Sequence, residues 1–262
     1  MGKASAPAAA GRLVSRLRAA GCVYAEEEAA LLLAGAPDDA GLERMLAERT
    51  AGRPLEYVLG WAEFCGLHLL VSDGVFIPRR RTEFLAGLAA AEPGLRAVTV
   101  DLCCGAGALS AVIARRTGTV EIFAVDCDAA AVACARRNLG ARVAVLHGDL
   151  FDPLPRRLRG RVDLLAANAP YVPTAQLDSL PSEARLYEPE ATHDGGADGL
   201  AVLARIAAQA PAWLRSGGVL LAECAETQAA ALADIYAAAG LSANVLRDPE
   251  TEATVVRGVE RG

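Results

Sequence analysis

The sequence predicts an α/β protein whose mostly parallel sheet is covered by helices on both faces, with a smaller helical part before it. From residue 97 onward, short apolar runs alternate with alanine-rich segments that fit helices, and this alternation is typical of parallel sheets. Residues 1–85 are instead rich in Ala, Leu, Glu and Arg, and are broken by glycine and proline. We therefore expect a helical domain over residues 1–85 and an α/β domain over residues 86–262.

The amino-terminal part contains helical segments and a short hairpin. Helices are expected over residues 8–20, 24–34, 39–52 and 82–91. Residues 63–71 form two short extended stretches with Gly66 at the turn, which predicts a β-hairpin that links the two domains. Residues 74–78 continue as extended chain into the basic run Arg79-Arg80-Arg81, and Thr82 can cap the helix that follows.

The remainder of the chain alternates between strands and helices. Strands are expected over residues 97–102, 120–125, 142–146, 162–167, 219–223, 242–246 and 254–259. Helices are expected over residues 108–116, 129–139, 201–214 and 227–239. The last two strands can pair as an antiparallel edge. Residues 172–198 carry little regular pattern, and because loops this long are usually functional, we expect a lid over the substrate here.

The composition argues against several classes of protein. The net charge of −6 argues against a general binder of nucleic acid or anionic membranes. No apolar run approaches the roughly 18 residues of a membrane span, and residues 1–10 lack the apolar core of a signal peptide. Seven cysteines without a C-x-x-C pair fit the reduced thiols of a cytoplasmic protein, and three histidines without ligand-like spacing argue against a metal site.

Three strand ends together predict a nucleoside-type cofactor. The first strand ends in Asp101-Leu102-Cys103-Cys104-Gly105-Ala106-Gly107, where glycines let the backbone approach a ligand beside a helix start. Asp126 ends the next strand, where a carboxylate can bind both ribose hydroxyls. Asp149-Leu150-Phe151 follow the third strand, and the two apolar residues can flank an adenine ring. Each turn alone can simply end a strand; the three together favour one nucleoside, because Ser110 replaces the last glycine or alanine of a dinucleotide motif.

The stretch Asn168-Ala169-Pro170-Tyr171 follows the fourth expected strand and predicts a site for a planar NH2 group. The Asn168 side-chain oxygen and the Ala169 carbonyl can each accept one N–H, and Tyr171 can lie against the plane of the group. The alternative is that this tetrapeptide only ends a strand, as Asn and Pro commonly do. The three strand ends upstream favour the binding site.

With these motifs in this order, the chain resembles S-adenosylmethionine-dependent class I methyltransferases that act on amino or amide nitrogen. A finer resemblance, to the protein-(glutamine-N5) methyltransferases of release factors or a ribosomal protein, covers almost the whole chain. It is carried by Arg53-Pro54-x-x-Tyr57-x-x-Gly60, Glu63-Phe64-x-Gly66, Ile77-Pro78-Arg79-x-x-Thr82-Glu83, Tyr187-Glu188-Pro189 and Asp194-Gly195-Gly196-x-Asp198-Gly199-Leu200. The resemblance implies a Rossmann-like fold, S-adenosyl-L-methionine as cofactor, and a protein substrate held partly by residues 1–85.

The resemblance also implies a role for each matching residue. The methionine part of the cofactor would be lined by Cys103, Cys104, Gly105, Ala106 and Gly107, its ribose bound by Asp126 and its adenine by Asp149 and Leu150. Asp101 and Asn168 would belong to the same cofactor pocket. The substrate glutamine would be held by Asn168, Ala169, Pro170 and Tyr171. Arg79, counted with these substrate-binding residues, would brace the loop beside the cofactor.

Three positions depart from the family pattern, and three kinds of acceptor stay open. Cys103 replaces a glycine, while Ala169 and Arg80 each replace a proline. The acceptor can be a protein glutamine amide, a small-molecule amide or amine, or an exocyclic adenine amine. The acidic charge disfavours nucleic acid. A protein that only binds the cofactor would have no use for the Asn168 motif. Methylation of a protein glutamine is therefore the leading interpretation.

Overall fold

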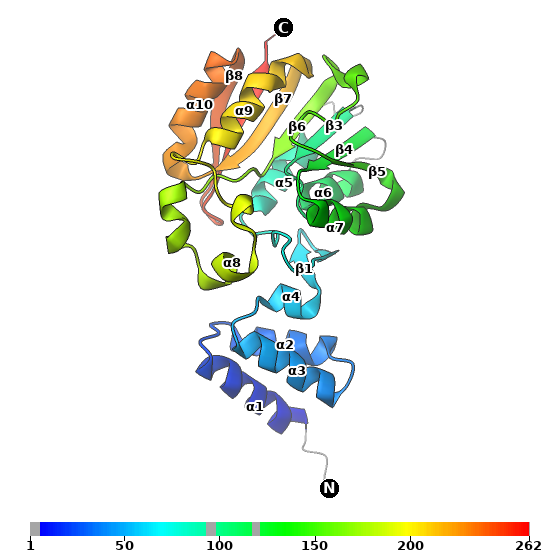
Figure 1. Ribbon diagram of the computed structural model, residues 1–262, viewed down its shortest axis with the longest axis vertical. Coiled ribbons are helices and arrows are strands. Elements are labelled where there is room, and N and C mark those ends of the chain that lie inside the picture. Colours follow the sequence, from blue (N-terminus) through cyan, green and yellow to red (C-terminus); the bar gives the residue numbers. More distant parts are fainter. Residues whose placement is uncertain (1–5, 93–97, 117–120, 262) are drawn as a thin grey trace.

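The computed structural model describes residues 6–92, 98–116 and 121–261 (Figure 1). Figure 1 shows the amino-terminal helices as a group at one end of the molecule, with the sheet and its helices at the other. The two chain ends lie at opposite ends of the long axis.

A seven-stranded sheet in the order β5-β4-β3-β6-β7-β9-β8 forms the centre of the α/β part. Its strands are β3 (Val98–Leu102), β4 (Glu121–Asp126), β5 (Val143–His147), β6 (Val162–Ala167), β7 (Leu214–Cys224), β8 (Leu241–Asp248) and β9 (Ala253–Glu260). The strands from β5 to β7 in this order pair in parallel, whereas β9 is antiparallel to both of its neighbours. The predicted fold class is confirmed, including the antiparallel edge.

Helices cover both faces of this sheet. On one face lie α5 (Thr82–Ala91), α6 (Ala108–Arg116) and α7 (Ala129–Leu139), and on the other α9 (Ala201–Gln209) and α10 (Ala229–Ala238). Ile113 of α6 belongs to the same core as Leu164, while Leu203 of α9 belongs to the core on the opposite side of the sheet with Leu102. Because β3 is covered on both sides, all of its residues are buried, including the polar Thr99 and Asp101.

The amino-terminal helices have an apolar core of their own. They are α1 (Ala6–Ala19), α2 (Ala25–Gly35), α3 (Asp39–Thr50) and α4 (Leu55–Leu59). Leu17, Leu32 and Leu46 are completely buried in this core. The short helix α4 was not predicted, because Pro54 suggested only a break. Pro54 instead stands directly before the helix, where its fixed φ suits the first turn.

The predicted hairpin is confirmed as β1 (Trp61–Phe64) and β2 (Leu67–Leu70). Cys65 and Gly66 between the strands both have positive φ, as a tight two-residue hairpin turn requires. Phe64 and Leu69 pack in the same core as Leu85 of α5. The hairpin is therefore attached to the α/β part of the molecule.

The helix predicted over residues 201–214 is too long, and the strand predicted from residue 219 begins too late. Helix α9 ends at Gln209 and continues as a 3₁₀ turn, η5 (Ala210–Ala212), because Pro211 has no N–H to extend the α-helix. Strand β7 then starts at Leu214 and passes through Gly217 and Gly218. A Cβ on Gly218 would lie 2.8 Å from the Val162 carbonyl oxygen, so this glycine serves close pairing with β6 and does not end the strand.

The other predicted boundaries lie within two residues of the observed ones, while Ala97 and Val120 fall outside the described residues. Residues 172–198, expected to be irregular, contain η3 (Thr174–Ser179), α8 (Ser182–Tyr187) and η4 (Glu190–Thr192). The remaining 3₁₀ turns are η1 (Gly140–Arg142), η2 (Arg156–Leu158) and η6 (Glu226–Gln228). We call residues 172–200 the lid segment below.

Candidate active site

A cavity of about 620 Å³ lies at the carboxyl ends of β3, β4 and β6, where open α/β sheets bind ligands. The lid segment forms one of its walls. The predicted site residues that line it are Arg79, Asp101, Cys103, Cys104, Gly105, Ala106, Asp126, Asn168, Ala169, Pro170 and Tyr171. Gly107, Asp149 and Leu150 are not among its lining residues. The structure thus brings most of the predicted residues to one place.

The glycine loop, residues 103–107, owes its shape to two glycines. Gly105 has φ +55°, and no other atom lies within 4 Å of the position that a Cβ would take, so its backbone is open to a ligand. Gly107 has φ +83°, and a Cβ there would lie 2.8 Å from Leu139 of α7. The first glycine therefore leaves room beside the backbone, while the second allows α6 and α7 to pack closely.

Asp126 supports the same loop from the end of β4. Its Oδ2 accepts from the Gly105 N–H at 2.8 Å, and its Oδ1 accepts from the Asp128 N–H at 2.9 Å. Burial raises the pKa of this carboxyl, and the backbone hydrogen bonds oppose that rise. Asp128 in turn caps α7 through the Ala130 N–H. The predicted ribose acid is thus held rigidly at the cavity wall.

Asp101 is completely buried beneath the loop. Its Oδ2 accepts from the Ser110 N–H at 3.1 Å and from Ser110 Oγ at 2.7 Å. Its Oδ1 has no hydrogen-bond partner among the described residues, and burial raises the pKa of the carboxyl to about 7. Ser110, which the sequence marks only as an absent glycine, therefore has a positive role in holding Asp101.

Asn168 and Tyr171, at the end of β6, are held by residues that the sequence did not single out. Asn168 Nδ2 donates to Thr82 Oγ1 at 3.3 Å, and Tyr171 Oη donates to Glu223 Oε1 at 2.9 Å. Thr82 was expected to cap α5. Arg81 occupies the cap position without a side-chain bond, and the Thr82 hydroxyl instead meets Asn168. We call residues 168–171 the acceptor turn.

Arg79 joins the chain before α5 to the lid segment. Its Nη2 donates to Glu188 Oε2 at 2.5 Å, and His193 Nε2 lies 2.9 Å from the same oxygen. Glu188 Oε1 accepts from the Ile77 N–H at 3.0 Å. Glu83 Oε1 accepts from the Cys65 N–H and holds the hairpin turn against α5. The Glu188 carboxylate, inside the Tyr187-Glu188-Pro189 motif, thus organises the Arg79 side of the cavity.

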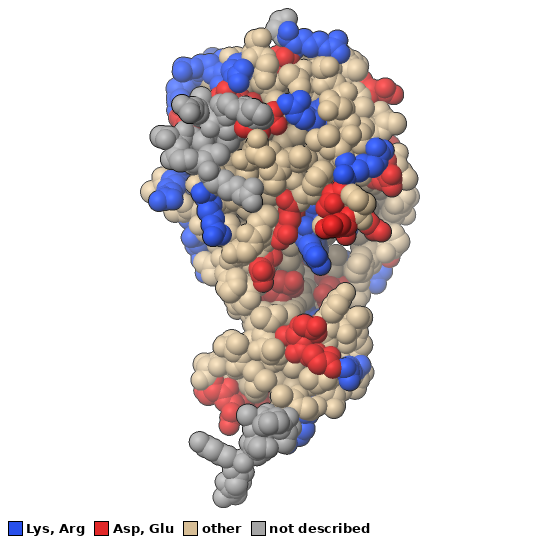
Figure 2. All heavy atoms as spheres, turned by 180° about the vertical axis from the view of Figure 1, so that it is seen from behind, with Lys and Arg blue, Asp and Glu red and all other residues tan. Residues whose placement is uncertain are grey.

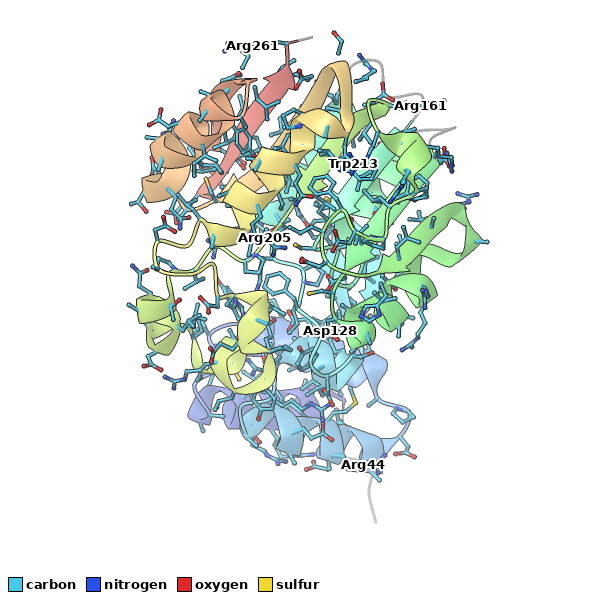
Figure 3. The ribbon with its side chains drawn as sticks, turned by 45° about the horizontal axis from the view of Figure 1, so that its top comes forward. Arg44, Asp128, Arg161, Arg205, Trp213 and Arg261 are labelled. Atoms are coloured by element: carbon cyan, nitrogen blue, oxygen red, sulfur yellow. The ribbon has the colours of Figure 1, made fainter. Side chains whose placement is uncertain are left out.

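Asp149 and Leu150 lie apart from the cavity wall. Asp149 Oδ2 pairs with Arg205 of α9 at 2.5 Å, and both side chains are about half exposed. Figure 3 shows Arg205 on its helix and Asp128 near the carboxyl edge of the sheet. Leu150 has φ +47° and packs in the core on the α9 side of the sheet. Their expected contact with an adenine ring stays a prediction.

Within the described ranges, no helix is both long and apolar enough to cross a bilayer. On the face drawn in Figure 2, basic and acidic side chains are interspersed, and acidic side chains gather near the narrow waist of the molecule.

Comparisons with known proteins identify the family. Residues 80–180 match the family model of the methyltransferase small domain. The chain is 37% identical over 199 residues to the release factor glutamine methyltransferase of Geobacter sulfurreducens. This match covers 75% of this chain and 69% of that protein. Two solved structures share the fold. A methyltransferase from Pyrococcus furiosus gives a TM-score of 0.57 at 15% identity, covering 76% of this chain and 91% of that one.

The second structure is the 16S rRNA N2 G1207 methyltransferase RsmC of T. thermophilus, in complex with AdoMet and guanosine. It gives a TM-score of 0.53 at 22% identity, covering 77% of this chain and 50% of that one. The identity to the Geobacter protein, over most of both chains, goes beyond a shared fold. This chain is a methyltransferase and belongs to the family of release factor glutamine methyltransferases.

Proposed function

We propose that this chain transfers a methyl group from S-adenosyl-L-methionine to the side-chain amide nitrogen of a glutamine in a protein of the release-factor type. The observation that carries the proposal is the orientation of the Asn168 amide at the cavity wall. Its Nδ2 is used by Thr82, which leaves Oδ1 to accept a hydrogen bond. Asn168 Oδ1 and the neighbouring Ala169 carbonyl suit the two N–H groups of a primary amide. The similarity to the Geobacter sulfurreducens enzyme supports a protein acceptor.

The residues around the glycine loop fit the cofactor. The open side of Gly105 lets the backbone lie against a ligand. Asp101 Oδ1 is a buried acceptor that suits the ammonium group of the methionine part. Asp126 keeps lone pairs for ribose hydroxyls after its two backbone bonds, because each carboxylate oxygen has two. When bound, the cofactor supplies an activated sulfonium methyl group.

The acceptor turn performs the rest of the chemistry. An amide nitrogen is a weak nucleophile because its lone pair is delocalised into the carbonyl, and its N–H groups become more acidic as that delocalisation is lost. Asn168 Oδ1 and the Ala169 carbonyl then accept stronger hydrogen bonds than in the ground state, which lowers the barrier. Preformed acceptors of this kind contribute about 3 kcal/mol, or roughly a hundredfold in rate. Tyr171 can lie against the plane of the amide and hold it in line.

Two other acceptors fit an NH2-binding motif, a small-molecule amide or amine and an exocyclic adenine amine. A nucleic-acid substrate needs a basic track for its phosphates. The net charge of −6 and the mixed charges on the face drawn in Figure 2 therefore disfavour a nucleic-acid acceptor. Cys104, Cys134 and Cys224 are buried free thiols, which fits a reducing compartment, and we place the enzyme in the cytoplasm.

The experiment that tests this function incubates the enzyme with radiolabelled S-adenosyl-L-methionine and a cell extract, and separates protein, nucleic acid and small molecules. We expect label in protein, on the glutamine of a Gly-Gly-Gln loop of a release factor. The matched control is the same release factor with that glutamine replaced by asparagine, which is expected to stay unlabelled. Label in the nucleic-acid or small-molecule fraction alone would contradict the proposal.

A further inference from the structure

The side of Tyr171 away from the cavity is held by Glu223, near the end of β7, and by Gln228 of η6. Its Oη donates to Glu223 Oε1 at 2.9 Å, and its carbonyl oxygen accepts from Gln228 Nε2 at 2.8 Å. These partners lie 52 and 57 residues further along the chain. Neither is among the described residues that line the cavity. The ring hydroxyl and the main-chain carbonyl of Tyr171 are therefore both held by the short segment of residues 223–228.

Glu223 also reaches Asn168 through Thr82. Its side chain is only 1% exposed, and a buried carboxylate is costly unless it is hydrogen-bonded. Burial raises the pKa of Glu223, while the hydrogen bond from Tyr171, the nearby Thr82 hydroxyl and the charge of Arg81 oppose the rise. Among the described residues Glu223 Oε2 has no hydrogen-bond partner. Because a carboxylate can only accept, it favours orientations of the Tyr171 and Thr82 hydroxyls that point their protons toward it. The lone pairs of Thr82 are then left for Asn168 Nδ2, which directs Asn168 Oδ1 to the cavity.

Gln228 connects the acceptor turn to the lid segment. Besides the Tyr171 bond, its Nε2 donates to the Asp198 carbonyl at 3.0 Å, and its Oε1 accepts from the Ala225 N–H at 2.9 Å. The side chain is buried, so these three bonds satisfy its amide. Gly199 fits tightly beside it, since a Cβ there would lie 2.2 Å from both Gln228 Nε2 and the Tyr171 oxygen. The base of the lid and the acceptor turn are thus clamped to one amide.

We propose that Glu223 and Gln228 are positioning residues for the methyl acceptor. Glu223 sets the orientation of the Tyr171 ring and of the Asn168 amide, and Gln228 locks the main chain of Tyr171 to the base of the lid. Both act through other residues and do not touch the reacting atoms. This inference rests on the proposed function, because it takes residues 168–171 as the acceptor site.

The test of Gln228 is the substitution Gln228→Met, which keeps the length of the side chain and removes its donor and acceptor. Gln209→Met, on the exposed end of α9, is the matched control. We expect kcat with the protein acceptor to fall about tenfold to a hundredfold, because small misplacements of a reacting group cost that much. The Kd for S-adenosyl-L-methionine should not change, and trypsin should cut faster after Arg185 in the lid. A kcat and a cleavage rate equal to those of the control would overturn this role.

The test of Glu223 is a comparison of Glu223→Gln in two backgrounds. In the otherwise unchanged enzyme the substitution is expected to lower kcat about tenfold, since glutamine can donate to Thr82 and reverse the Asn168 amide. In a Thr82→Val/Tyr171→Phe background both hydroxyls near Glu223 are already absent, so the further change should have no effect on kcat. An equal fall in both backgrounds, as expected of a general structural role, would refute the positioning role.

Two further measurements keep the outcomes separate. If Glu223→Gln does not fold, Thr82→Ser and Thr82→Val decide, because only the serine keeps the hydroxyl; equal kcat values for these two would refute the role. The unmodified enzyme is assayed in parallel with the release factor. If it labels no glutamine, the proposed function fails, whereas unchanged variants of an enzyme that does label glutamine refute only the positioning roles.

Discussion

A single backbone angle explains why glycine suits position 103, where the resemblance to the family implies one. Cys103 has φ +58°, in the left-handed region, which costs an L-residue about 1–2 kcal/mol. Glycine adopts this conformation freely. The Cys103 side chain lines the cavity, and burial raises the pKa of its thiol, so it is a neutral wall and not a nucleophile. Cysteine at position 103 therefore keeps the path of the loop but adds local backbone strain.

Asp101 is expected to make cofactor binding depend on pH. Its pKa is about 7 because of burial, so the carboxyl is neutral in more acidic solution and charged in more basic solution. A cationic ligand favours the charged form, and affinity for S-adenosyl-L-methionine should therefore increase as the pH rises from about 6 to about 7.5. Calorimetry at several pH values measures this. Asp101→Asn should lack the increase, and an equal increase in both proteins would contradict the assignment.

The same residue is expected to influence stability with a definite sign. Between roughly pH 4 and pH 7 the folded protein keeps a proton on Asp101 that the unfolded chain has already lost. The free energy of unfolding should fall over this range, by about 4 kcal/mol at most, and then stay level. Urea denaturation at several pH values measures the free energy of unfolding of the wild type and of Asp101→Asn. If the wild type becomes more stable relative to Asp101→Asn as the pH rises, the predicted sign is wrong.

At the scale of elements, the crossing of the lid segment and the acceptor turn leaves no room at Gly199. Gly199→Ala combines a left-handed φ of +76° with a Cβ 2.2 Å from the Tyr171 oxygen. Gly160→Ala is a control with φ +67° and open space around the Cβ. We expect the control to lower the free energy of unfolding by about 1 kcal/mol. Gly199→Ala should cost more and also lower kcat/KM for the acceptor; equal effects of the two substitutions on both quantities would contradict this packing.

Most of the fold was predictable because its elements repeat simple patterns. Strand β6 was predicted to the residue, since an apolar run ends in Asn and Pro. The helix predicted over residues 201–214 was too long because Pro211 ends α9, and the next strand was predicted too late because it contains Gly217-Gly218, which serve pairing between β7 and β6. Close approach of two strands is a tertiary property and leaves no local signal. The same limit hid α4, whose start at Pro54 resembles a helix break.

The site was predictable only where one segment carries a whole motif. The glycine loop and the acceptor turn are each a contiguous motif, and apart from Gly107 their residues line one cavity together with Asp126, as expected. Thr82, Glu223 and Gln228 were not predicted as site residues, because each meets the acceptor turn from a segment at least 52 residues away. A buried glutamate at the end of an apolar strand was the one available signal for Glu223. The roles of Asp149 and Leu150 stay predictions.

At the scale of the whole molecule, Arg49 connects the amino-terminal helices to the lid segment. Its guanidinium pairs with Glu28 of α2 at 2.6 Å and with Glu183 of α8 at 2.6 Å. The Arg49 and Glu28 side chains are both about 10% exposed, whereas Glu183 is 43% exposed and lines the cavity. One cation thus stabilises the helical part internally and also links it to the wall of the site.

The difference in burial predicts unequal effects of breaking the two pairs. Arg49→Leu leaves Glu28 buried without its partner and should lower the free energy of unfolding by about 3–5 kcal/mol. Glu183→Gln removes only the half-exposed partner and should cost about 1 kcal/mol or less. Denaturation in guanidinium chloride compares both with the wild type. Similar losses for the two variants would contradict the account of Arg49 as mainly an internal strut.

The central claim is that the Asn168 oxygen accepts a hydrogen bond that strengthens during methyl transfer. The most direct measurement compares Asn168→Ala with Asn244→Ala, the same change on the distant edge strand β8, by methyl-transfer kinetics and by calorimetry with S-adenosyl-L-methionine. We predict that Asn168→Ala lowers kcat about a hundredfold or more while the Kd for the cofactor stays close to that of the control. An Asn168→Ala variant that retains most of its activity would contradict the account.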